Sequence, residues 1–126
     1  MIDFKNAKYP KLRPVKASNF DKMVSPLLIQ GEEIIEAYQG IRDGIVFTNH
    51  RVIVINVQGV TGKKKDFTSL PYRKVQSYSV ETAGVFDLDC ELTLWFSELG
   101  VVYFELSSGA KIVELCRKIS EHILLR

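Results

Sequence analysis

The fold of this chain is decided within Ile41–Val75, where the sequence reads IRDGIVFTNHRVIVINVQGVTGKKKDFTSLPYRKV. β-Branched residues are densest in Ile45–Val57, as is typical of strands. Short turns at Asp43-Gly44 and Asn49-His50 predict antiparallel neighbours, because a parallel return needs a dozen or more residues. A longer loop with two glycines and three lysines leads into another strand, which ends at Pro71. The stretch therefore predicts a β-meander.

Working outward, the pattern predicts seven strands and one long helix. The strands are expected at Glu32–Ile41, Ile45–Thr48, Arg51–Val57, Asp66–Leu70, Arg73–Glu81, Asp87–Ser97 and around Val101–Leu106. Asp87–Ser97 alternates most regularly, with apolar residues at every second position. After Ser108, a predicted N-cap, the period changes to that of a helix. Its apolar stripe is Ile112, Leu115, Cys116, Ile119 and Ile123, and Glu114 and Lys118 form an i,i+4 pair.

The start of the chain is less regular. Residues 1–17 contain two prolines among spaced lysines and are expected to form a basic, extended and partly disordered arm. Ser18 is a predicted cap for a short helix at Asn19–Leu28, made irregular by Pro26. Residues 18–126 then form one mainly β domain. We expect four strands and three strands curled into a barrel, with the C-terminal helix covering one open end.

The composition of the chain excludes some classes of function. The 126 residues are 46% hydrophobic and 25% charged, which is ordinary for a globular domain. The net charge of +2 gives no broad basic field for nucleic acid, so no nucleic-acid partner is expected. Cys90 and Cys116 fall in a strand and a helix and are interpreted as reduced thiols. No secretion signal or membrane-spanning run is recognised, which favours a cytoplasmic location.

Four strings in this sequence resemble one family. They are RDGIVFTNHR from Arg42, QGVTGKK from Gln58, LPYRKV from Leu70 and VETAGVFDLDCEL from Val80. Together with the element pattern, they are similar to the small bacterial pleckstrin-homology-like (PH-like) domains over about residues 20–125. The resemblance implies a PH-like barrel, assembly into rings, no catalytic residues and no defined cellular role.

No constellation in the sequence predicts catalysis, a metal site or a cofactor. The loop Gly59–Lys65 lacks the glycine spacing and the following helix of a nucleotide-binding loop. His50 and His122 have no carboxylate or thiol at ligand spacing. No serine, cysteine or lysine has a recognisable activating partner. We therefore interpret the protein as a binding module and not as an enzyme.

The lysine triplet Lys63, Lys64 and Lys65 is the candidate site for an anion or a lipid. Three surface lysines each contribute about 1 kcal/mol toward an anionic bilayer. Asp43 and Glu98 are expected at the same end of the barrel and would weaken this attraction. The alternative interpretation is a solvated turn.

Trp95 is the strongest candidate for a contact residue. Alternation places it opposite the core face of its strand, with Tyr103 on the same side of the next strand. The candidate interface consists of Trp95, Tyr103, Thr93, Glu91, Asp89 and Asp87, with Arg73 and Lys74 as basic counterparts on a neighbouring copy. The alternative is that the N-terminal helix, through Phe20, Met23 and Leu27, covers both aromatic rings.

The sequence thus predicts a non-enzymatic PH-like module that forms a cyclic homo-oligomer, for which a pentamer-like ring is a guess. Another protein partner is also compatible with this interpretation. The alternative function is peripheral binding to anionic phospholipid at a membrane surface.

Overall fold

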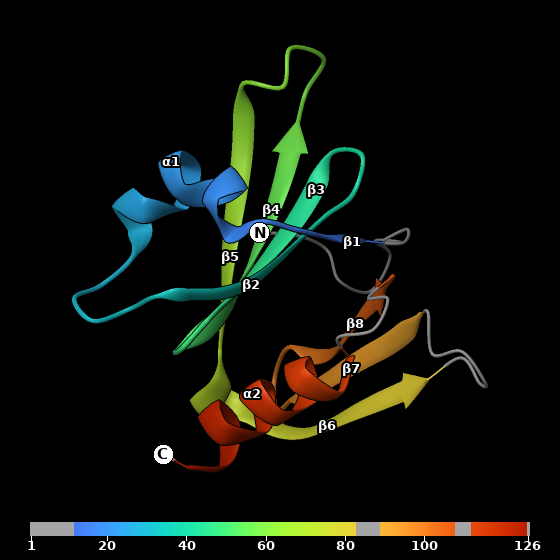
Figure 1. The fold of residues 1–126 in the computed structure, drawn as a ribbon. Helices are drawn as coiled ribbons and strands as arrows, with labels where there is room; N and C mark the ends of the chain where they lie inside the picture. The colour runs from blue at the N-terminus through green and yellow to red at the C-terminus, as the bar shows by residue number, and fades with distance from the viewer. Residues whose placement is uncertain (1–11, 83–88, 108–111, 126) are drawn as a thin grey trace.

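The computed structural model describes residues 12–82, 89–107 and 112–125, and all statements below concern these. They form two antiparallel sheets (Figure 1). The first has the order β1 (Arg13–Val15), β2 (Ile34–Gln39), β3 (Asp43–Thr48), β4 (Arg51–Gln58) and β5 (Lys64–Pro71). The second consists of β6 (Val75–Thr82), β7 (Cys90–Phe96) and β8 (Gly100–Leu106). The predicted architecture, mainly β with two antiparallel sheets and a C-terminal helix, is confirmed.

The meander has apolar residues on both faces because each face is covered. Toward the interior, Ile45 and Phe47 of β3 belong to the main core together with Val52 and Val54 of β4. On the opposite face, the residues between them pack in a second cluster beneath the N-terminal helical segment. These residues are Val46, Ile53 and Ile55, and they are joined by Phe20 and Val24. A strand without polar alternation is what such two-sided burial produces.

The structure has one strand more than the expected arrangement of four and three strands. β1 lies in the predicted arm and pairs with β2, so the described strands divide five and three. Just before it, the backbone of Leu12 donates to Glu105 O at 3.0 Å and accepts from Ser107 N at 2.8 Å. The first sheet is thereby joined to β8. β1 was not predicted from the sequence because this strand is short and contains Pro14. Strands tolerate a proline at a sheet edge.

The N-terminal helix is broken into three short pieces. They are η1 (Ala17–Phe20), α1 (Asp21–Val24) and η2 (Ser25–Leu27). The predicted cap at Ser18 is wrong, because the segment starts after Lys16, which makes no side-chain cap hydrogen bond. Pro26 near the start of η2 prevents a regular continuation of α1. The segment is held by packing on the sheet, through Phe20 and Val24.

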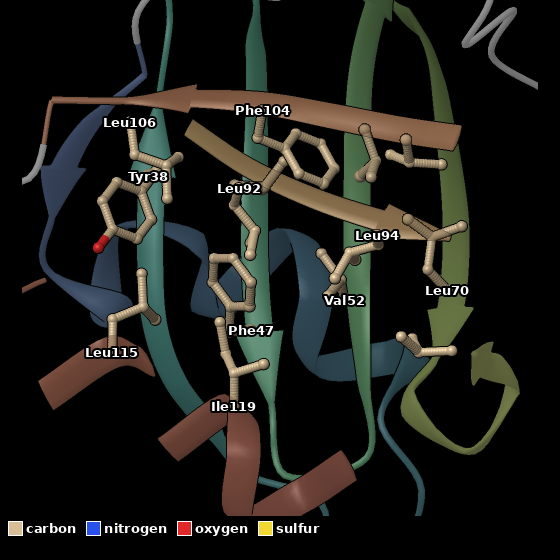
Figure 2. Close-up of a cluster of buried hydrophobic side chains, with 14 of the residues drawn as sticks. Tyr38, Phe47, Val52, Leu70, Leu92, Leu94, Phe104, Leu106, Leu115 and Ile119 are labelled. Carbon is tan, nitrogen blue, oxygen red and sulfur yellow. The ribbon is translucent and has the colours of Figure 1, made fainter. Parts of the chain in front are cut away.

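The second sheet and α2 (Ile112–Leu124) complete the main core. Figure 2 shows Leu115 and Ile119 pointing from α2 toward Tyr38 and Phe47. The predicted pair of Glu114 and Lys118 is present at 3.4 Å, and Lys118 also reaches Glu36 of β2 at 3.1 Å. These contacts fix the helix over the interior face of the meander. The predicted cap Ser108 lies outside the described residues.

Both cysteines are thiols, with Cys90 buried and Cys116 half-buried. Burial raises the pKa of Cys116 above its ordinary value. Within the described ranges, no helix has the length and apolarity needed to cross a membrane.

Candidate functional site

The most distinctive surface is the side of the three-stranded sheet that faces away from the core, which we call the outer face. Strand register arranges its side chains in three rows of three. The rows are Ser77, Trp95 and Val101; Ser79, Thr93 and Tyr103; and Glu81, Glu91 and Glu105. The face therefore passes from an apolar row, through a row of hydroxyls, to an acidic row.

No described segment covers the aromatic rings of the outer face. Trp95 of the apolar row and Tyr103 of the neighbouring row are 36% and 43% exposed, and Val101 beside Trp95 is exposed as well. The N-terminal segment does not shield them, because its Phe20 and Met23 pack against the five-stranded sheet. The alternative in which that segment covers Trp95 is therefore wrong. Large aromatic side chains left at a sheet surface are enriched at protein interfaces.

The acidic row places like charges side by side. Glu91 lies directly opposite both Glu81 and Glu105, an arrangement that destabilises an isolated sheet. The Tyr103 hydroxyl donates a hydrogen bond to the Glu91 carboxylate. That bond, together with burial and the surrounding carboxylates, raises the pKa of Tyr103 to about 12. The row is thus a concentrated negative surface, and its charges are complementary to a basic partner.

The basic candidates lie at the other end of β6. Arg73 and Lys74 belong to η3 (Tyr72–Lys74), a helical turn that precedes the strand, and both side chains are exposed. Lys74 and Glu81 are seven positions apart, or about 23 Å along an extended strand. This separation keeps the two charged groups from pairing within one chain. The sheet consequently carries opposite charges at its two ends.

Not every predicted interface residue belongs to the outer face. The structure brings Trp95, Tyr103, Thr93 and Glu91 together there. Asp89 is half-buried just before β7 and already has an interaction partner within the chain. Asp87 lies outside the described residues. Sequence alternation did not single out three further members of the face, Glu81, Glu105 and Val101, since cross-strand register is needed to align them.

The lysine triplet lies at a second surface, which we call the hairpin tip. It consists of the β2–β3 and β4–β5 connections, which are tied together because Val57 N donates to Arg42 O at 3.3 Å. The Arg42 guanidinium also donates to Gly59 O. Lys63, Lys64 and Lys65 are exposed beside this junction. In Figure 1 the β4–β5 hairpin projects away from the second sheet.

The hairpin tip is also apolar, which the sequence analysis missed. Ile41 is 94% exposed and Val60 is fully exposed, one on each connection. A pocket of about 420 Å³ lies between them, with Met23 and Asp43 also in its lining. Burial raises the pKa of Asp43 despite the opposing effect of Arg42. The expectation that Glu98 shares this end with the lysines is wrong. Glu98 lies in the turn after Phe96, and Phe96 pairs with Val75, which follows η3 at the opposite end of β5.

Neither surface has the composition of a metal site. Among residues 12–82, 89–107 and 112–125, no three His, Cys, Asp or Glu side chains are grouped so that they could hold an ion.

Comparison with known proteins gives consistent matches. The model of the bacterial PH domain family matches residues 3–123. The uncharacterized protein YjqA of Bacillus subtilis (strain 168) is 51% identical over 91 residues, covering 71% of this chain and 73% of YjqA. The uncharacterized protein YozO of the same strain is 38% identical over 109 residues, covering 86% of this chain and 94% of YozO.

Among solved structures, one similar protein is a DUF1696 family protein with a pleckstrin-homology domain from Shewanella loihica PV-4. It superposes with a TM-score of 0.77 at 38% identity, over 90% of this chain and 98% of that one.

Proposed function

Because the chain belongs to the bacterial PH domain family, we propose that it is a binding and assembly module, not an enzyme, and that it forms a cyclic homo-oligomer through the outer face. The observation that carries this proposal is the exposure of Trp95 and Tyr103 on a sheet face that no other described segment covers. At about 25 cal/mol per Å² of apolar surface, covering both rings contributes a few kcal/mol before the entropy cost of association.

Charge supports a head-to-tail contact. The acidic row of one copy complements Arg73 and Lys74 at the opposite end of β6 on the next copy. Such complementarity sets orientation more than affinity. Two different surfaces that meet in this way close into a ring when the rotation between neighbours divides a full turn. The number of subunits, for which a pentamer is our starting guess, follows from that rotation.

Trp95→Ala is expected to release folded monomer, because it removes the largest apolar side chain of the contact. The measurement is size-exclusion chromatography with light scattering, and the far-UV circular dichroism spectrum should be retained. Val113→Ala is the matched control, since Val113 is 70% exposed on α2, away from the outer face. If the wild type already elutes as a monomer at tens of micromolar, the assembly proposal is wrong.

Charge reversal probes the orientation of the contact in the same assay. Glu91→Lys should weaken assembly, and adding Lys74→Glu should restore part of it if these residues meet across neighbouring copies. Absence of any restoration would assign a different basic counterpart to the acidic row.

A second function, peripheral binding to anionic phospholipid, is favoured by the composition of the hairpin tip. Ile41 and Val60 are exposed beside Lys63, Lys64 and Lys65, an arrangement that suits insertion of apolar side chains below anionic head groups. Asp43 at the same tip works against tight binding. We therefore propose weak attachment that depends on both charge and apolar contact.

Vesicle flotation tests this second function. Wild-type protein is expected to float with phosphatidylserine-containing vesicles at low salt and to lose binding as ionic strength rises. The triple variant Lys63→Glu/Lys64→Glu/Lys65→Glu should not float. A control triple variant at exposed positions elsewhere, Arg13→Glu/Lys16→Glu/Arg117→Glu, should keep most of the binding. An equal loss of vesicle binding in both variants would mean that binding depends only on the net charge of the protein. The hairpin tip would then not be a lipid-binding site.

A further inference from the structure

A groove of about 470 Å³ lies at the end of the molecule where α2 finishes, apart from the outer face and the hairpin tip. Its walls come from Ile29 in the connection after η2, the β3–β4 turn, the end of β5, η3, and the C-terminal end of α2 with Leu125 after it. Figure 1 shows β5 descending toward the C-terminal end of α2 in this region. Volumes of this size accommodate small organic ligands.

An ion pair between Glu32 and Arg51, whose charges neutralise each other, forms the floor of the groove. The buried Glu32 carboxylate accepts two hydrogen bonds of 2.9 Å from Arg51, and one of 2.7 Å from Thr48. Arg51 donates in addition to Ser69 Oγ at 2.9 Å and to Leu27 O at 2.7 Å. Glu32 and Arg51 therefore satisfy each other and leave little net charge for a ligand.

One side of the groove carries nitrogen donors that have no acidic partner among the described residues. They are the guanidinium of Arg73 and the imidazoles of His50 and His122. His122 is held in place because its ring stacks on Tyr72, with centroids 5.9 Å apart and planes 16° from parallel. Tyr72 is fixed in turn, since its hydroxyl donates to Thr48 O at 2.6 Å. Glu121 at the rim is the opposing charge.

Apart from Asn49, whose side-chain amide is bonded to the backbone of Gly31 and Glu33, the remaining walls are apolar. Ile29 is 62% exposed and Leu125 is 80% exposed, and Pro71 is the last residue of β5, directly before η3. An arginine with two imidazoles suits a single negative charge, whereas Glu121 disfavours a dianion such as phosphate. The apolar walls suit a short hydrocarbon or aromatic body.

We propose that this groove binds a monocarboxylate with a short apolar body, with its carboxylate on Arg73 and its body against Ile29 and Leu125. The same chemistry is offered by a free carboxylic acid and by the C-terminus of a peptide that ends in apolar residues. The groove does not depend on ring assembly. Because Arg73 is also an interface candidate, the Trp95→Ala protein is used beside the wild type to separate the two effects.

The test is an amide NMR titration with octanoate, with octanol and acetate as probes that each lack one half of the ligand. We expect saturable shifts at His50, Arg73 and His122 with octanoate only. Arg73→Gln should weaken octanoate about tenfold, and Glu121→Gln should bind it at least as tightly as wild type, because the two substitutions change the groove's charge in opposite directions. Both side chains are exposed, so the fold is expected to survive.

N-acetyl-Leu-Leu, compared with octanoate, distinguishes a peptide C-terminus from a free carboxylic acid. Its C-terminal amide is the control that lacks the carboxylate. Binding of the acid in preference to octanoate would assign the groove to peptide termini, and preference for octanoate would assign it to free acids. The proposal is overturned if no probe gives saturable shifts at millimolar concentration, or if Arg73→Gln and Glu121→Gln leave the affinity for octanoate unchanged. The same result in the Trp95→Ala protein would show that assembly is not the cause.

Discussion

Leu115→Asp is expected to leave the protein unfolded under conditions in which the wild type is folded. The Leu115 side chain is buried in the main core beneath α2, and none of the described residues of that core is basic. An unpaired charge buried in this way costs several kcal/mol, against a total stability of about 5–15 kcal/mol for a typical domain. Ile119→Asp, one turn further along the helix, should act in the same way.

Thermal unfolding followed by circular dichroism checks this expectation. Val113→Asp is the control, because Val113 is exposed on the same helix and surface changes usually alter stability by no more than about 0.5 kcal/mol. A cooperative melt of Leu115→Asp at the wild-type temperature would mean that α2 does not close the core.

The parts of the fold that could be predicted are those with a strong local period. The stripe of α2 is visible in sequence because Leu115, Ile119 and Ile123 all face one core. β7 is visible because its inward residues alternate strictly with outward ones. The meander is visible because its turns are too short for any parallel connection. Each of these signals depends on neighbours within about a dozen residues.

The parts that could not be predicted depend on contacts between distant segments. β1 has three residues, one of which is a proline, and it is specified by pairing with β2 and by the bridge of Leu12 to β8. The alignment of Glu81 with Glu91 and Glu105 follows from register, which is shifted by an irregularity between Val75 and Ser77. Alternation alone gives the face of a side chain and not its cross-strand partner.

The groove could not be predicted from the sequence either, because its residues come from distant segments of the chain. Arg51 and Glu32 are 19 positions apart, and His122 comes from the far end of the chain. Arg73 was predicted to begin a strand, whereas it lies in a helical turn beside the groove. Histidines without ligand spacing in sequence were passed over, although packing on Tyr72 holds one of them in a defined position.

Glu32→Gln is expected to destabilise the protein by about 3 kcal/mol at neutral pH, because it leaves the Arg51 guanidinium without its charged partner in a mostly buried site. Burial by itself raises the pKa of Glu32. Hydrogen bonds from Arg51, Thr48 and the backbone of Ile29 lower it by more, so that the pKa falls from an ordinary 4.5 to about 2.

The sign of the pH dependence follows from this lowered pKa. The charged carboxylate stabilises the folded state above pH 4.5, and its contribution is lost as the pH falls from 4.5 through about 2. The gap in unfolding free energy between wild type and Glu32→Gln should therefore be widest near neutral pH and should narrow through this range.

Denaturant unfolding at a series of pH values measures the gap. Glu33→Gln is the matched control, since its side chain is exposed and its substitution should give a small difference at every pH. A gap between wild type and Glu32→Gln that stays constant from neutral pH to pH 2 would mean that the carboxylate is not the charged partner of Arg51 in the folded protein. Arg51 would then add its own positive charge to the groove, and the preference for a single carboxylate would no longer follow from the charges around it.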